Sequence, residues 1–160
     1  MLQLTKKTDY AILALSYMAQ RPGVVCTARE IAEQFHVPSA LLMNVLKTLC
    51  QGELVRSLRG AKGGYTLAQL AEQITLSDII VVIEGPVRFV QCAAKGSGPR
   101  DPCVLMATCP VSRPVRKVHN QLNEFLKQVS LAQIAFDEEY GGRAAAQMAK
   151  RGGASTEDVA

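Results

Sequence analysis

Three of the five cysteines, Cys92, Cys103 and Cys109, follow one another with ten and then five intervening residues. Their thiolates are soft ligands, which select iron–sulfur clusters, zinc or copper(I). Structural zinc sites usually contain cysteine pairs separated by about two to four residues, and this loop has none. Its Gly and Pro residues disfavour a helix or a strand, so a metal cluster could supply the cross-links that the loop lacks. The pattern therefore favours an iron–sulfur cluster, 2Fe–2S or 4Fe–4S, over zinc.

Three thiolates leave the fourth cluster ligand to come from elsewhere. Asp9, Ser112, His119 and a small molecule are the candidates, although a structural or solvated role is the simpler interpretation of His119. The remaining cysteines, Cys26 and Cys50, are assigned no ligand role. Cys50 ends a predicted helix and is most simply a small buried apolar residue.

The expected cellular location also bears on the cysteines. The N-terminal residues lack the apolar core of a signal peptide, and the longest aliphatic run, residues 79–83, is far shorter than the ~20 residues that cross a bilayer. We therefore expect a cytoplasmic protein without membrane contact, where clustered cysteines more often bind metal or do redox chemistry. The alternative to a cluster is a thiol–disulfide switch, in which Lys95 and Arg100 favour a thiolate.

The residues upstream of the cysteines predict a helix-turn-helix. Thr27 and Glu30 have the spacing of a capping box, which starts a short helix. Residues 36–38 form a turn, Ser39 can cap the next helix, and Gly52 suits the left-handed conformation after its end. A short helix, a tight turn and a second helix are typical of DNA-binding helix-turn-helix units.

Two further elements flank this unit. Thr8 and Asp9 can cap a first helix, which is apolar on nearly every face and so belongs in the core. Residues 54–58 and 65–67 are predicted strands, joined by a Gly-rich basic turn. A hairpin directly after a helix-turn-helix is the pattern of a winged helix.

Several side chains of this module could contact DNA. On the third helix, Asn44 could pair with an adenine edge and Lys47 with a guanine or a phosphate. Arg59, in the turn of the wing, suits a narrow minor groove. The full set of candidates is Thr27, Ser39, Ala40, Met43, Asn44, Lys47, Arg56, Arg59, Lys62 and Tyr65. The alternative is that these side chains form a solvated face without a role in binding.

The charge distribution favours the DNA-binding interpretation. Residues 1–66 hold eight Lys or Arg and four Asp or Glu, whereas the remainder holds ten of each. The whole net charge of +4 therefore lies in the N-terminal module. Such a placement is expected if this part of the chain meets a polyanion.

Downstream of the cysteines, Pro110 and Pro114 fit the entry of a long helix. Its apolar residues recur at spacings of three and four, and they are Val115, Val118, Leu122, Phe125, Leu126 and Val129. We expect this stripe to pair two copies of the chain, because palindromic DNA sites need two-fold symmetric proteins. A further helical turn is predicted at residues 130–134, and the residues from Asp137 onward are predicted to be disordered.

The predicted fold is mainly α with a small β-hairpin wing. The expected parts are a winged helix-turn-helix DNA-binding domain (1–70), a connecting helix and extended segment (71–91), the cysteine loop (92–109), a dimerisation helix with a short terminal helix (110–136), and a tail (137–160). The sequence contains no G-x-S-x-G, Walker or H-E-x-x-H motif. We therefore expect neither enzymatic activity nor a small-molecule substrate.

Taken together, these motifs resemble the IscR/NsrR-type family of winged-helix iron–sulfur transcription regulators, over residues 1–136. The resemblance rests on LTKKTDYAI, TAREIA…VPSALL, LVRSLRGAKGGYTLA, ITLSDII, the three cysteines and VSLAQIA. It implies a homodimer that binds partly palindromic promoter DNA, with the cluster or its loss setting the DNA affinity. Cys92, Cys103 and Cys109 match the cluster cysteines of the family, although the first interval is longer than in many members.

Two branches of the family differ in the fourth ligand. The IscR-like branch has a His three residues after the last cysteine, where this chain has Ser112. In the NsrR-like branch an Asp near the N-terminus is supplied by the other subunit, and Asp9 stands at that position. The start of the chain also resembles regulators of the SUF cluster-assembly system. The resemblance thus implies an NsrR-like or SUF-regulator-like protein with Asp9 as a ligand in trans.

The predicted function is a regulator, for instance a repressor, whose cluster senses redox state, nitric oxide or cluster supply and sets promoter affinity. One alternative keeps the DNA-binding function and uses the cysteines as a thiol–disulfide switch. A second alternative is an iron–sulfur carrier that uses the winged domain for protein contacts. Steep salt dependence of DNA binding would separate the regulators from the carrier, because phosphate contacts impose it.

Overall fold

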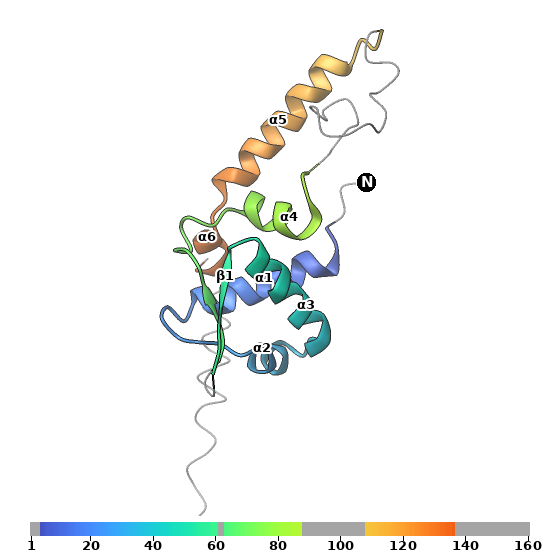
Figure 1. Ribbon diagram of the computed structural model, residues 1–160. Helices are drawn as coiled ribbons and strands as arrows, with labels where there is room; N and C mark the ends of the chain where they lie inside the picture. Colours follow the sequence, from blue (N-terminus) through green and yellow to red (C-terminus); the bar gives the residue numbers. More distant parts are fainter. Residues whose placement is uncertain (1–3, 61–62, 88–107, 137–160) are drawn as a thin grey trace, which may run out of the picture.

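The computed structural model describes residues 4–60, 63–87 and 108–136, and it confirms the predicted mainly helical fold with a two-stranded wing (Figure 1). The elements in chain order are α1 (Lys6–Ala19), α2 (Ala28–Phe35), α3 (Ser39–Gln51), β1 (Val55–Leu58), β2 (Gly64–Leu67), α4 (Leu76–Glu84), α5 (Ser112–Gln128) and α6 (Leu131–Ala135). Among these described helices, none combines the length and the apolar character needed to cross a membrane. The predicted disordered tail, residues 137–160, lies outside the described residues.

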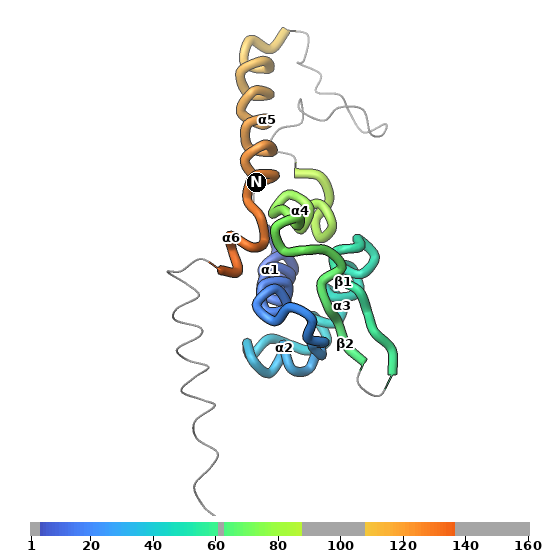
Figure 2. Tube along the Cα trace, turned by 90° about the vertical axis from the view of Figure 1, so that its left-hand side faces the viewer, coloured from blue at the N-terminus to red at the C-terminus, as the bar shows by residue number. Residues whose placement is uncertain are grey.

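Helix α1 lies at the centre of the core and contacts α3, α4, α6 and β2. Figure 2 shows it between α2 on one side and α4 on the other. Ala11, Ala14 and Leu15 are fully buried, as expected for a helix that is apolar on most of its faces. The largest fully buried aliphatic side chains come from five helices and the segment before α4, and they are Leu15, Ile31, Leu42, Leu46, Leu49, Ile74, Ile79 and Leu131.

The start of α1 differs from the prediction that Thr8 and Asp9 cap it. The N-cap is Thr5, whose side chain accepts a hydrogen bond from the Lys7 amide at 3.2 Å. Thr8 is buried inside the helix, and its hydroxyl donates to Glu84 at 2.7 Å. The sequence contains Thr residues at both positions, and the contact with Glu84, 76 residues away, places Thr8 inside the helix. Asp9 is therefore free of a capping role and lies exposed in the first turn.

Both predicted ends of α3 also need correction. The N-cap is Pro38 and no side chain caps the helix, so Ser39 is its first residue and not its cap. At the other end Gly52 has a φ of −85°, and Glu53 takes the left-handed conformation with a φ of +57°. The Leu54 amide then bonds to the Leu49 carbonyl at 3.0 Å, which completes a Schellman motif one residue later than expected.

Gly52 is required for close packing and not for its conformational freedom. A Cβ atom at this position would lie 2.5 Å from both Cγ atoms of Val82 on α4. Because the backbone angles of Gly52 suit any residue, the steric conflict with Val82 is the main effect of a larger side chain. The absence of a side chain at Gly52 thus allows the end of α3 to pack closely against α4.

We expect Gly52→Ala to lower the free energy of unfolding by about 1–3 kcal/mol, as overpacking of a filled site usually does. Urea unfolding checks this prediction. In a Val82→Ala background the same substitution should cost clearly less, because the conflicting methyl groups are gone. Equal costs in the two backgrounds would show that Val82 is not the reason for the glycine.

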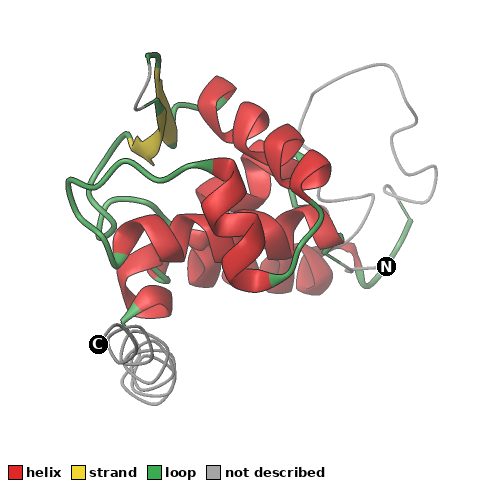
Figure 3. Ribbon diagram, turned by 90° about the horizontal axis from the view of Figure 1, so that it is seen from below, coloured by secondary structure: helices red, strands yellow, loops and turns green. Residues whose placement is uncertain are grey.

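The wing is an antiparallel hairpin in which Val55 pairs with Leu67 and Leu58 with Gly64. It stands at the edge of the helices (Figure 3). Tyr65 also pairs with Cys26 through two backbone hydrogen bonds of 2.7 and 2.9 Å, which join the hairpin to the start of α2. A Cβ on Gly64 would lie 2.6 Å from the Cys26 carbonyl oxygen, so the glycine permits this pairing.

Helix α5 extends away from the core, and the chain then returns to it through α6 (Figure 1). The return is fixed by backbone hydrogen bonds from Leu76 to Val129 at 2.8 Å and from Leu131 to Ile74 at 2.7 Å. The predicted last helical turn is confirmed as α6, which a Ser130–Gln133 capping box starts. Because α6 packs on α1, the outer helix is attached to the DNA-binding module at its C-terminal end.

Candidate DNA-binding surface and cysteine site

The helix-turn-helix is held in place by its capping box and by one buried tyrosine. The Thr27 hydroxyl accepts from the Glu30 amide at 3.1 Å, while the Glu30 carboxylate accepts from the Tyr17 hydroxyl at 2.7 Å. Burial, followed by the hydrogen bond to Glu30, raises the pKa of Tyr17 to about 12. Phe35 packs edge-on against the Tyr17 ring, with centroids 5.6 Å apart. These contacts orient α2, and through it α3, on the central helix α1.

Helix α3 presents one buried and one exposed face. Leu42, Val45, Leu46 and Leu49 are buried, as the apolar spacing predicts. The predicted DNA-contacting residues of this helix are all exposed, and they are Ser39, Ala40, Met43, Asn44 and Lys47. Leu41 is exposed as well, with 47% of its surface accessible, and the sequence analysis did not select it. Only the structure shows that Leu41 is exposed, because nothing in the sequence distinguishes it from the other leucines of this apolar helix.

The candidate DNA-contacting residues outside α3 differ in how exposed they are and in which contacts they already make. Arg56 and Arg59 of the wing are exposed, whereas Tyr65 is half-buried and engaged in the pairing with Cys26. Thr27 is exposed, but its hydroxyl is used by the capping box. Lys62, which the sequence also selects, lies outside the described residues.

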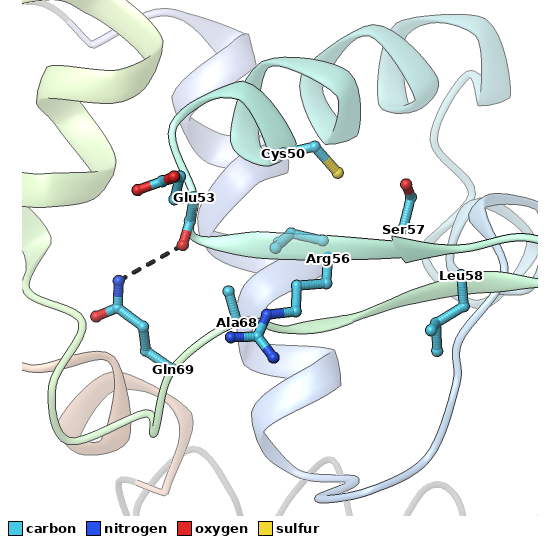
Figure 4. A pocket seen from close by; sticks show the side chains of 8 residues that line it. Cys50, Glu53, Arg56, Ser57, Leu58, Ala68 and Gln69 are labelled. Atoms are coloured by element: carbon cyan, nitrogen blue, oxygen red, sulfur yellow. Dashed lines mark hydrogen bonds between the residues drawn. The ribbon is translucent and has the colours of Figure 1, made fainter.

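A pocket of about 570 Å³ lies where the wing meets the end of α3 (Figure 4). The side chain of Gln69 donates to the Glu53 carbonyl at 3.5 Å, and the Arg56 side chain extends from β1 toward Ala68. Cys50 lines the inner wall, where burial raises the pKa of its thiol. A thiol that is harder to ionise is a poor metal ligand, which agrees with leaving Cys50 out of the cluster.

Of the three predicted cluster cysteines, only Cys109 lies in the described part of the chain, and Cys92 and Cys103 lie outside it. Cys109 is a free, half-buried thiol three residues before α5. The described residues contain no group of three or more His, Cys, Asp or Glu that could hold a metal ion. Two of the three predicted thiolates are outside that search.

The described candidates for the fourth ligand differ in how they are engaged. The Ser112 hydroxyl donates to the Cys109 carbonyl at 3.0 Å. His119 is buried, with Nε2 at 2.9 Å from the Asn123 amide nitrogen and Nδ1 without a partner among the described residues. Asp9 is exposed and is not needed as a cap. A free thiol and an unengaged carboxylate are of the types that can bind iron, so Cys109 and Asp9 are the described candidates whose donor atoms are available.

Glu84, which the sequence did not single out, connects the end of α4 to the helix that carries Asp9. It is the last residue of α4, and one of its oxygens accepts from the Thr5 amide at 3.1 Å, the Thr5 hydroxyl and the Thr8 hydroxyl. The hydrogen bond from the Thr5 hydroxyl, then that from Thr8, lowers the pKa of Glu84. Gly85 follows with a φ of +87° and ends α4.

We expect Glu84→Gln to reduce the free energy of unfolding at neutral pH by about 1 kcal/mol, as for the loss of a helix cap. The lowered pKa means that the charge contributes fully above the usual value of 4.5 and that this contribution is lost as pH falls through the lowered pKa. Wild type and variant should therefore converge in acid, which urea unfolding at several pH values can follow. Glu72→Gln is the matched control, since Glu72 is an exposed glutamate and the substitution removes the same charge; an equal effect there would refute a specific role for Glu84.

Comparison with known proteins identifies the family of this chain. The sequence model of the Rrf2 family, described as an iron-dependent transcriptional regulator, matches residues 4–137. Protein aau3 of Rhizobium meliloti is 32% identical over 126 residues, covering 79% of this chain and 80% of its own. The structure of T. potens IscR matches with a TM-score of 0.62 and 29% identity, covering 86% of this chain and 88% of its own.

A second structural neighbour shows the same architecture. CymR, the global cysteine regulator of B. subtilis, matches with a TM-score of 0.65 and 24% identity, over 84% of this chain and 97% of its own. At that identity the likeness concerns the fold alone. With the family match and the winged helix-turn-helix described above, the chain belongs to the Rrf2 family of DNA-binding transcription regulators.

Proposed function

We propose that this regulator is a homodimer whose DNA affinity is set by an iron–sulfur cluster, held by Cys92, Cys103 and Cys109 with Asp9 of the partner subunit. The observation that carries the proposal is the geometry of α5. Its outer end follows Cys109, and Val111, Val118 and Phe125 of its apolar stripe are exposed. A sensor loop at the outer end of this projecting helix can influence two DNA-binding helices if a second chain packs against the stripe.

The uncovered stripe has the repeat of a two-helix seam. Val111, Val118 and Phe125 follow one another at intervals of seven residues, and they are 56%, 51% and 59% exposed. Val115 and Leu122 lie between them at alternating spacings of four and three and are half-buried. Apolar residues at such spacing pack against an equivalent helix. Pairing through α5 would bury this stripe and is consistent with a two-fold symmetric DNA site.

Supply of Asp9 in trans agrees with the length of α5. The helix has 17 residues, so at ~1.5 Å per residue it separates Cys109 by about 25 Å from the end that returns to the core. Asp9 lies exposed in the first turn of α1, the central helix of that core. A partner chain paired along α5 can bring its own α1 toward Cys109.

DNA contacts are assigned to the exposed residues of α3 and the wing. Asn44 is placed to pair with an adenine edge and Lys47 with a guanine or a phosphate, while Arg59 enters the minor groove. We assign phosphate contacts to Arg56 and Lys62, to the Ser39 hydroxyl, and to Thr27 and Tyr65. Ala40 and Met43 complete the surface that enters the major groove.

When bound, the cluster supplies a cross-link that oxygen or nitric oxide can remove. Two contacts support the conversion of this chemistry into a change of shape. Glu84, at the end of α4 and eight residues before Cys92, bonds to Thr8 of α1, and Gly52 lets α4 pack closely on the end of α3. Ordering or release of the loop can therefore alter the spacing of the two recognition helices in the dimer.

Purification without oxygen tests the cluster directly. We expect coloured protein that contains iron and sulfide, with absorption and electron paramagnetic resonance spectra that change in Asp9→Ala. Colourless protein, free of iron and sulfide after reconstitution, would remove the cluster. A reversible Cys92–Cys103 or Cys103–Cys109 bridge without iron would then indicate a thiol–disulfide switch. DNA binding that is absent or insensitive to salt would instead indicate the carrier function.

A further inference from the structure

The exposed face of α3 is unusually apolar for a surface that binds DNA. Leu41 and Met43 have 47% and 44% of their surface accessible, although the core beside them is complete. On the surface of the helix Ala40 lies between Leu41 and Met43, and it is exposed as well. The helix contains no Asp or Glu, and Lys47 is its only cation. Apolar contacts are therefore available to this helix in addition to the hydrogen bonds of Asn44 and Lys47.

The chemistry of the major groove restricts what such a face can contact. Among the base edges that face this groove, the thymine 5-methyl is the apolar group, and apolar side chains pack against it. The N-terminal residues of a recognition helix lie nearest the bases, and Leu41 and Met43 are the third and fifth residues of α3. At about 100° per residue they lie on either side of a strip that contains Ala40 and Asn44.

We infer that α3 recognises A·T-rich half-sites mainly through thymine methyl groups, with Leu41 and Met43 as specificity-determining residues. Asn44, between them on the helix surface, can bond an adenine edge, so the three side chains favour the same base pairs. Ala40 leaves room for the backbone to approach the groove. The inference rests on α3 being the recognition helix of the proposed function, and it does not depend on the cluster.

Selection of the full-length protein on a random duplex DNA library gives the first test. We expect enriched half-sites to carry thymines at the positions that α3 contacts. Replacing those thymines with deoxyuridine removes only the methyl groups and should weaken binding by about fourfold per methyl, which corresponds to one buried methyl-sized group. Enrichment of G·C pairs at these positions, or equal affinity for thymine and uracil duplexes, would overturn the inference.

Variants assign the methyl contacts to residues. In Met43→Gln and Leu41→Ala the difference between thymine and uracil duplexes should shrink toward zero, because the apolar partner is lost. Lys47→Ala should weaken both duplexes alike, since a phosphate contact does not sense the methyl. Retention of the full thymine preference in both apolar variants would contradict their role. Circular dichroism confirms that these surface variants fold.

The outcomes separate this inference from the sensor proposal. The thymine preference is measured in whichever state of the protein binds DNA, with or without iron. A protein that prefers thymine but carries no cluster would leave the inference intact and remove the sensor. If Leu41 and Met43 instead contact another protein or a second copy, their substitution would change sedimentation of the free protein and leave the thymine preference unchanged.

Discussion

Phe125→Glu is expected to convert the protein to monomers and to weaken operator binding by roughly 100-fold or more, because two linked half-site contacts become one. Phe125 is 59% exposed in the single chain and is the last of the seven-residue repeats of the proposed α5 seam. A carboxylate there would be buried against the partner helix in the proposed dimer, and burial of an unpaired charge is costly. Analytical ultracentrifugation and a binding titration give the two results.

Asn120→Glu is the matched control for Phe125→Glu. It adds the same charge to the same helix at an exposed position on the face opposite the seam. We expect this control to remain dimeric and to bind DNA with near wild-type affinity. A Phe125→Glu protein that stays dimeric would show that the subunits pair through another surface.

Cys109→Ser is expected to abolish the cluster and to change operator affinity by about five- to 150-fold, the usual range of coupling between two sites. Serine keeps the size of the side chain but removes the soft thiolate. Asp9→Ala should have a smaller effect on iron content, because three thiolates remain. Cys50→Ser is the control, since Cys50 lines the pocket beside the wing and is assigned no ligand role.

Iron content and fluorescence anisotropy on the same anaerobic samples check this prediction. Loss of iron in Cys109→Ser without any change in operator affinity would separate the cluster from the regulation. An equal loss of iron in Cys50→Ser would instead point to general instability of the protein.

Much of the fold follows from local patterns in the sequence. The capping box at Thr27 and the paired strands of the wing depend on residues close together in the sequence, and the structure contains them where they were predicted. The predictions are wrong where contacts between residues far apart in the sequence determine the local structure. Thr8 lies inside the helix because its hydroxyl bonds to Glu84, and Gly52 is needed for the close approach of Val82 and not for a left-handed turn.

The candidate site was predictable in part for the same reason. Helical periodicity separates the buried and exposed faces of α3, so Asn44 and Lys47 were identified correctly as exposed. Periodicity did not identify Leu41, because it gives no separate signal for an exposed leucine in an apolar helix. Glu84 was missed because its partners are almost half the chain away, and no local pattern reports such a contact.

We propose that a cluster held by three thiolates sets how the two DNA-binding helices are spaced. The most direct test of this proposal is operator affinity, measured anaerobically for wild type with and without the cluster and for the Cys92→Ser, Cys103→Ser, Cys109→Ser triple variant. The account predicts that removing the cluster shifts wild-type affinity at least about fivefold and that the triple variant behaves as the cluster-free protein. Identical affinity in all three samples under reducing, oxidising and nitric oxide-treated conditions would contradict it.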